Sequence, residues 1–218
     1  MVVAGDLKLT VSATNASIGA TGAADDINVT LSGTLTASAA DGTGGIFVTE
    51  TGAMSVNTID AGGGLGGDIE LESTGAITDA AGADETTDVT GADLTIRDST
   101  GIGVDANDAL NLSVDNLTIT TTSNDAFITE ANGIGLGTVN VVANALDLRA
   151  ITGDITNNTS AVTAGDLTLT ATADGGAIGA TGAADDINVT LSGTLTATAS
   201  TGNGGIFISQ TGDLTLGA

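Results

Sequence analysis

The chain has 218 residues, with 33 Gly, 3 Phe and no Pro, Cys, His, Trp or Tyr, yet 41% of its residues are hydrophobic. This composition excludes a disordered chain, which would be poor in β-branched residues, and it excludes disulfides and thiol chemistry. The formal charge of −24 repels nucleic acid and anionic membrane surfaces. No apolar run approaches the roughly 18 residues of a membrane span, so we expect neither nucleic-acid binding nor membrane insertion.

The first part of the chain shows the pattern of short β-strands. Ile27, Val29 and Leu31 alternate with polar residues, which is the period of a strand and not of a helix. We expect strands over residues 6–13, 17–20 and 27–32, joined by corners rich in Gly, Asn and Asp. Three strands in each coil predict three parallel sheets and no helix.

Internal repeats extend this pattern over the whole chain. Residues 5–56 return almost unchanged at 165–216, and the related segments 45–50, 125–130 and 205–208 lie about 80 residues apart. A short motif of alternating apolar residues marks each coil, at intervals of about 27 residues. Its first residues, which we expect to pack in the core, are Leu7, Leu35, Ile69, Leu94, Leu117, Leu146, Leu167 and Leu195.

These repeats predict an all-β chain, a right-handed parallel β-helix (β-solenoid) of about eight coils of about 27 residues. The coils are expected to follow a three-coil cycle of about 80 residues, in which Leu7, Leu94 and Leu167 are equivalent. Successive coils stack ~4.8 Å apart, so the chain would form one elongated domain over residues 1–218 with a thin aliphatic core.

The segment 102–119, continuing through Phe127 and Glu130 to residues 133–137, resembles the repeats of giant bacterial surface proteins of the filamentous-haemagglutinin-like adhesin type. Those repeats often carry Asn-Pro-Leu before the third strand, where this chain has Asn107-Asp108-Ala109-Leu110. The resemblance implies a secreted β-helix that holds adhesive regions away from the cell, and hence an extracellular or cell-surface location. Residues 1–5 lack the features of a signal peptide, so we expect a fragment of such a protein.

Two acidic pairs are the candidate sites for chemistry. Asp25 and Asp26 recur as Asp185 and Asp186, and some β-helices cleave polysaccharides with carboxylates on their outer face. No Lys or Arg is close to either pair in the sequence, and the chain has no His, Cys, Tyr or Trp to assist, so we expect no enzyme and no catalytic residue. The same carboxylates could hold a weak surface Ca²⁺, and no other cofactor is expected.

Outward-facing residues give a test of register. If the coils stack in line, one column runs Glu72, Arg97, Thr120, Arg149 and Thr170, and Glu72 and Arg97 form a register-fixing pair.

Other outward and apolar residues leave further interpretations open. Thr-x-Thr triplets such as Thr168/Thr170 are typical of ice-binding solenoids, but charged triplets interrupt them. We expect the three Phe, which lie in all-apolar triplets, to fill the core.

The sequence thus favours a structural or adhesive segment, acting as a stalk or scaffold with a cell-surface or matrix ligand. The alternative is a self-assembling filament subunit, because the first and last modules are nearly identical and uncapped, which favours end-to-end association. A polysaccharide-active enzyme and an ice-binding protein are less favoured readings.

Overall fold

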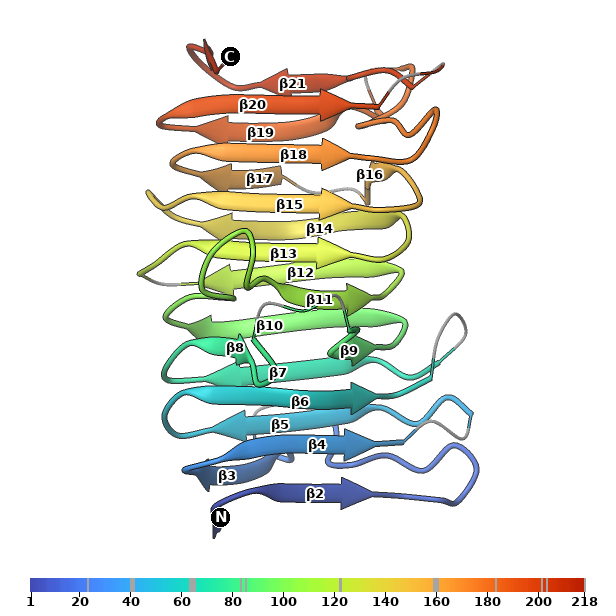
Figure 1. Ribbon diagram of the computed structural model, residues 1–218, viewed down its shortest axis with the longest axis vertical. Coiled ribbons are helices and arrows are strands. Elements are labelled where there is room, and N and C mark those ends of the chain that lie inside the picture. The colour runs from blue at the N-terminus through green and yellow to red at the C-terminus, as the bar shows by residue number, and fades with distance from the viewer. Residues whose placement is uncertain are drawn as a thin grey trace.

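The computed structural model confirms an all-β, right-handed parallel β-solenoid (Figure 1). It describes residues 1–22, 24–39, 42–62, 66–82, 84, 86–121, 123–158, 161–182, 184–200, 202 and 204–217, without the side chains of Asp98 and Thr121. The chain runs left to right along the near sheet and right to left along the far sheet as it rises (Figure 1). Over these residues, no helix is both long and apolar enough to cross a membrane.

Two parallel sheets form the opposite walls of the solenoid. Sheet A contains, in spatial order, β1 (Val2–Ala4), β3 (Ile27–Leu31), β5 (Ile46–Glu50), β7 (Ile69–Ser73), β10 (Asp93–Ser99), β12 (Asn116–Thr121), β14 (Ile134–Val141), β17 (Ala161–Ala164), β19 (Ile187–Leu191) and β21 (Ile208–Gln210), with β16 (Ile155–Asn157) paired to β14. Sheet B contains β2 (Leu7–Thr10), β4 (Thr34–Ser38), β6 (Met54–Asp60), β9 (Val89–Thr90), β11 (Leu110–Ser113), β13 (Ala126–Glu130), β15 (Leu146–Ala150), β18 (Leu167–Ala171), β20 (Thr194–Ala199) and β22 (Thr215–Leu216), with β8 (Ile77–Asp79) paired to β6.

The predicted third sheet is reduced to isolated bridges among the described residues. The strand expected at 17–20 is a single bridge between Ile18 and Ile46, and Ile178 and Ile206 form the equivalent bridge. Gly19 follows Ile18 with φ +74°, a left-handed conformation that a strand cannot continue through. A Cβ at Gly19 would also collide with the carbonyl oxygen of Phe47, so a glycine turn ends this strand after one residue.

The coils are shorter and more numerous than predicted. Ten strands lie on the continuous path of each sheet and make about nine turns, and equivalent residues in neighbouring coils are 28 positions apart in some coils but only 20 in others. Leu35 lies in sheet B and Ile69 in sheet A, so the interval between these two markers covers one and a half turns. The predicted count of about eight coils differs slightly from the observed nine turns, because both sheets carry the same alternating motif.

The long repeat and the short repeat relate to the two sheets differently. Leu7 and Leu167 both lie in sheet B, seven strands apart, whereas Leu94 lies in sheet A, so the predicted three-coil equivalence is wrong. Phe47 lies in sheet A and Phe127 in sheet B. The 80-residue period therefore corresponds to three and a half turns. A shift by one period moves a residue of one sheet to the equivalent position in the other sheet.

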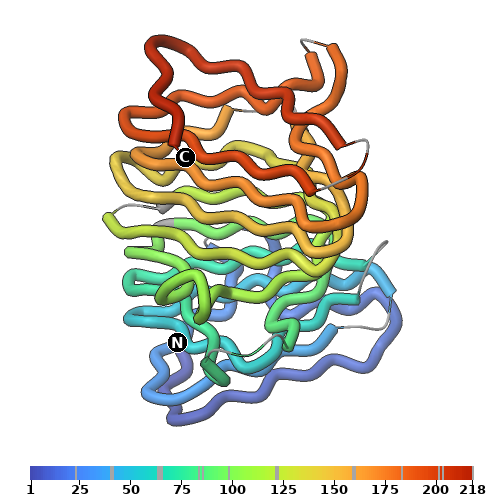
Figure 2. The backbone as a smooth tube through the Cα atoms, turned by 45° about the horizontal axis from the view of Figure 1, so that its top comes forward, coloured from blue at the N-terminus to red at the C-terminus, as the bar shows by residue number. Residues whose placement is uncertain are grey.

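The two sheets face each other across the interior of the solenoid (Figure 2), and a continuous cluster of buried aliphatic side chains fills the space between them. Seven of the eight marker residues are buried, and Leu7, in the first coil, is half-buried against the core. The Phe prediction holds only in part: Phe47 is buried, at 6% exposed, but it pairs in register with Glu70, and the half-buried Phe127 pairs with Asp147, on the outer faces of the sheets, while their Ile and Val neighbours face inward. Medium-sized aliphatic side chains are thus sufficient to fill this narrow interior.

Candidate functional site

The four acidic residues singled out as Ca²⁺ candidates differ in their surroundings. Asp25 and Asp185 are exposed at equivalent corners of the first and last repeats. Asp26 is only 6% exposed, whereas Asp186, at the same position of the second repeat, is half-buried. Neither sequence pair therefore acts as a unit, and Asp26 alone enters a larger cluster.

That cluster, here called the carboxylate cluster, consists of Asp26, Glu70 and Glu72 on the outer face of sheet A. One carboxylate oxygen from each residue lies within 4.8 Å of the other two. Asp26 directly precedes β3, which pairs with β5, while Glu70 and Glu72 lie on β7 opposite Phe47 and Thr49 of β5. Three successive coils thus bring together residues that are far apart in the sequence.

The polar contacts of the carboxylate cluster use only part of its oxygens. Arg97 Nη2 lies 2.9 Å from Glu70 Oε2, and the Thr49 hydroxyl donates a hydrogen bond of 2.9 Å to Asp26 Oδ2. The second oxygen of each, Asp26 Oδ1 and Glu70 Oε1, is buried without a hydrogen-bond partner. Burial raises the pKa of Glu70, Arg97 lowers it, and Asp26 and Glu72 raise it further. The arrangement can accept another cation.

Sequence reasoning found the register of this face but not its ion pair. Glu72 and Arg97 are register partners across β7 and β10, and Thr120 is the next residue of the column, as the alternation predicts. The guanidinium nevertheless binds Glu70, which lies diagonally. Arg149 and Thr170 belong to sheet B, so the predicted continuation of the column is wrong.

Arg97 also corrects the statement that no basic residue is close to Asp26. The sequence separates the two residues, and only the stacking of coils joins them through Glu70. The Thr triplets are divided in the same way: Thr168 and Thr170 lie in sheet B, whereas the triplet at 118–120 lies in sheet A.

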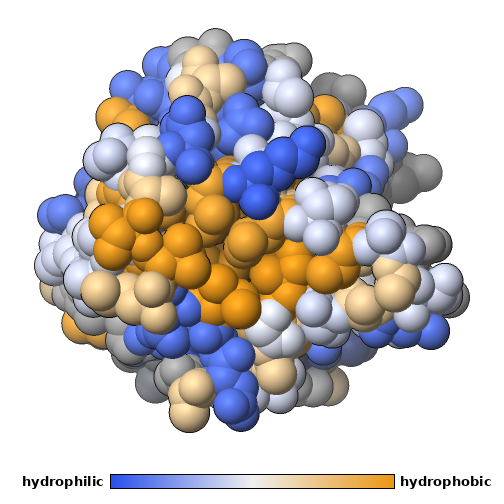
Figure 3. All heavy atoms as spheres, turned by 90° about the horizontal axis from the view of Figure 1, so that it is seen from below, coloured by the Kyte–Doolittle hydropathy of each residue, from blue (hydrophilic) through white to orange (hydrophobic). Residues whose placement is uncertain are grey.

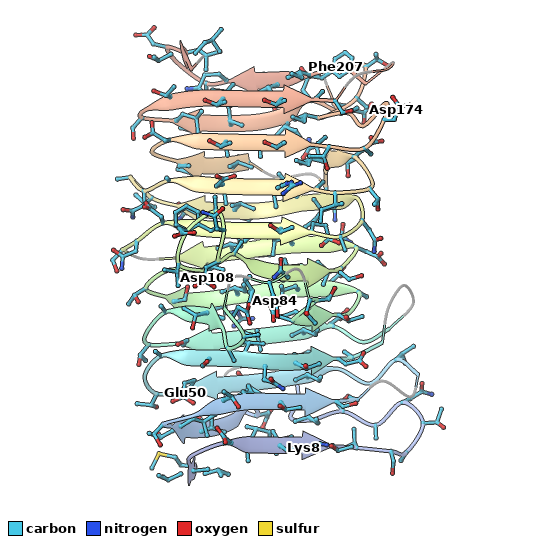
Figure 4. All side chains as sticks on the ribbon, viewed as in Figure 1. Lys8, Glu50, Asp84, Asp108, Asp174 and Phe207 are labelled. Atoms are coloured by element: carbon cyan, nitrogen blue, oxygen red, sulfur yellow. The ribbon has the colours of Figure 1, made fainter. Side chains whose placement is uncertain are left out.

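A second concave region lies over sheet B, beside the loop 103–109 that stands out from the solenoid (Figure 1). Two adjoining hollows of about 280 and 220 Å³ share Thr129 and the exposed Arg149. Phe127 and Asp147 line one of them, and burial raises the pKa of Asp147. Figure 4 labels Asp84 and Asp108 in this part of the molecule. The lining combines polar and apolar residues, and sequence reasoning missed the groove because its residues come from five separate coils.

Two buried glutamates occupy equivalent corners of the two sheets. Glu50 ends β5 and accepts a hydrogen bond of 3.0 Å from the backbone N–H of Leu31 (Figure 4). Glu130 ends β13, is fully buried and accepts backbone N–H groups of Val114 at 3.2 Å and Asn132 at 3.0 Å. Burial raises the pKa of Glu50, and it raises the pKa of Glu130 to about 7 despite these hydrogen bonds. Both carboxylates hold corners of the backbone.

A further acidic group has a shifted pKa in the coil of β8 and β9. Burial, with smaller contributions from Asp79 and Asp84, raises the pKa of Asp88 to about 7, although the N–H of Asn111 donates to it at 2.9 Å. A carboxyl group that is protonated near neutral pH could serve as a general acid. Asp88 and Asp79 are only 2% and 8% exposed, however, so both are shielded from a substrate.

Comparison of the chain with protein-family models, with curated proteins and with solved structures found no match. The β-solenoid of parallel strands is established by the structure itself.

Proposed function

We propose that the chain is a rigid structural segment of an extracellular surface protein, which acts as a stalk or scaffold and not as an enzyme. The observation that carries this proposal is the unbroken stacking of ten strands in each sheet around one continuous aliphatic core. Such a rod would be about 43 Å long, since nine steps of ~4.8 Å separate its first and last coils. Its high negative charge supports solubility in an extended, repetitive structure.

The groove beside the loop 103–109 is the feature that best suits an adhesive role. It combines a concave shape with a cation, Arg149, and an aromatic ring, Phe127, on an otherwise acidic and aliphatic surface. We place the contact with a cell-surface or matrix ligand there. The resemblance of residues 102–119 to adhesin repeats supports the same location.

The second candidate function is a filament subunit that assembles end to end. Figure 3 shows an apolar centre with a polar rim on the face of the first coil, where Val3 is 71% exposed. At the opposite end, Leu216 is 70% exposed beside a hollow of about 330 Å³ that Leu195 and Ile206 help to line. Two apolar faces with open strand edges would stack in a head-to-tail, non-closing contact.

Small-angle X-ray scattering and light scattering over a range of concentrations separate the two functions. A rigid segment predicts a constant molecular mass and a maximum dimension of roughly 50 Å. A filament predicts a mass that grows with concentration, and growth that Val3→Asp or Leu216→Asp abolishes while Thr120→Asp, an exposed control in the middle of the solenoid, does not. A compact or unfolded scattering profile would contradict both.

A further inference from the structure

We propose that Asp26, Glu70 and Glu72 form a Ca²⁺-binding site on the outer face of sheet A, which ties the coils of β3 and β7 across β5. The site concerns the carboxylate cluster alone and does not depend on whether the chain acts as a stalk or as a filament subunit.

The geometry of the cluster suits a large, hard cation. Ca²⁺ takes six to eight oxygen ligands at about 2.3–2.6 Å, so ligands on opposite sides of the ion lie roughly 5 Å apart. The three carboxylate oxygens lie within 4.8 Å of one another, and the Thr49 hydroxyl adjoins them through Asp26. Water can supply the remaining ligands from the side of Glu72, which is half-buried.

Two buried oxygens provide an independent sign of a missing ligand. Asp26 and Glu70 are each 6% exposed, and Asp26 Oδ1 and Glu70 Oε1 have no hydrogen-bond partner. A buried carboxylate oxygen without a donor or a cation is costly. The neighbouring Arg97 satisfies only the other oxygen of Glu70. A bound cation would satisfy both free oxygens at once.

The chemistry of the donors selects the type of metal. All three side-chain ligands are carboxylates, and the chain has no His or Cys that would favour zinc or copper. Mg²⁺ demands near-ideal octahedral geometry at about 2.0–2.1 Å and gives up water reluctantly, whereas Ca²⁺ tolerates an irregular set. With three carboxylates and one guanidinium, the cluster has a formal charge that one divalent ion neutralises.

The chain contains its own control for this site. Residues 18–37 and 178–197 have the same sequence, so Asp186 has the same neighbours in sequence as Asp26. Among the described residues, β21 is the last strand of sheet A, so no described strand places carboxylates beside Asp186 as β7 does beside Asp26. Asp26→Asn and Asp186→Asn remove the same charge from the same local sequence, but only the first alters the cluster.

Isothermal titration calorimetry with CaCl₂, in a buffer of about 0.15 M NaCl to screen diffuse attraction, tests the site. We expect one saturable Ca²⁺ per chain, a loss of affinity of at least about tenfold in Asp26→Asn, and an affinity within about twofold of the unchanged chain in Asp186→Asn. Equal losses in the two variants, or no saturable binding by the unchanged chain, would overturn the proposal.

Two further variants keep the test decisive if Asp26→Asn disturbs folding. Glu72→Gln changes the half-buried ligand and should weaken binding by about tenfold while the circular dichroism spectrum stays that of the unchanged chain. Arg97→Gln removes the competing cation from Glu70 and should tighten binding severalfold. Unchanged affinity in a folded Glu72→Gln would place the ion elsewhere and refute the site.

Discussion

The first and last repeats of this chain have almost the same sequence but different surroundings. Asp26 is followed along sheet A by the strand that carries Glu70 and Glu72, whereas β21 is the final strand next to the coil of Asp186. Identical local sequence thus gives a cluster of three acids in one repeat and a lone carboxylate in the other. In a solenoid, the coils above and below determine what a surface residue can do.

Glu50 and Gln210 occupy the same corner in the first and last repeats, and the contacts at this corner differ because the residue differs. Glu50 accepts the N–H of Leu31 in the first repeat. At the equivalent position of the last repeat, the Gln210 amide donates to the carbonyl oxygen of Leu191, the counterpart of Leu31, at 3.5 Å, and to those of Thr211 and Asp213, each at 3.2 Å. The same corner is therefore held by a titratable group in one repeat and by a neutral group in the other.

The largest expected difference between the repeats is in the core. Leu35 is fully buried between coils, while Leu195, its counterpart, is 5% exposed beside the hollow near the last coil. We expect Leu35→Ala to lower the free energy of unfolding by about 2–5 kcal/mol and Leu195→Ala by at least about 1 kcal/mol less. Urea denaturation followed by circular dichroism measures both, and equal losses would contradict the account of the two environments.

The second prediction concerns the pH dependence of the titratable corners. Burial raises the pKa of Glu130 to about 7, above its value of 4.5 in an unfolded chain, so folding favours the protonated form. The contribution of Glu130 to the free energy of unfolding is complete below about pH 4.5 and is lost as the pH rises through about 7. Over this range the free energy of unfolding falls by roughly 3 kcal/mol. Asp88 acts in the same direction.

Glu130→Gln reproduces at this corner the amide of the last repeat. Its amide can accept only one of the two backbone N–H groups that Glu130 accepts, but it carries no titratable proton. We expect it to show a shallower fall in stability than the unchanged chain between about pH 5 and pH 8. Urea titrations at several pH values provide the measurement. A slope as steep as that of the unchanged chain would show that Glu130 titrates normally.

The third prediction compares the two arginines. Arg97→Gln removes the ion pair to the buried Glu70 and should lower the free energy of unfolding by about 1 kcal/mol in the absence of Ca²⁺. Arg149 is exposed in the groove over sheet B, so Arg149→Gln should change it by less than about 0.5 kcal/mol. A larger loss of stability in Arg149→Gln than in Arg97→Gln would contradict the assignment of the stabilising ion pair to Arg97.

The smallest effect is expected where the repeats do not differ. Asp25 and Asp185 are both exposed at the same corner. Asp25→Ala and Asp185→Ala should each change the free energy of unfolding by less than about 0.5 kcal/mol and by the same amount. Unequal thermal unfolding midpoints in these two variants would reveal a role for Asp25 that its exposure does not indicate.

Strand alternation and repeats were sufficient to predict the parallel solenoid and the aliphatic residues of its core, but not the outward position of the Phe residues. They could not distinguish the two sheets, because an inward Leu of sheet A and one of sheet B occur in the same motif, as Leu94 and Leu167 do. The carboxylate cluster could not be predicted from the sequence for the same reason. Asp26 was visible as a candidate, but its partners on β7 follow from the stacking order, and no local pattern encodes that order.

The central claim is that one rigid, continuous solenoid joins the two repeats, and a distance between them tests it directly. Thr10 and Thr198 are exposed in sheet B, eight strands apart, and the chain has no native Cys, so Thr10→Cys and Thr198→Cys give a clean pair of spin-label sites. Double electron–electron resonance should show a single narrow distance distribution centred near 38 Å, which is about eight steps of ~4.8 Å. A broad distribution, or one centred below about 30 Å, would contradict a continuous rod.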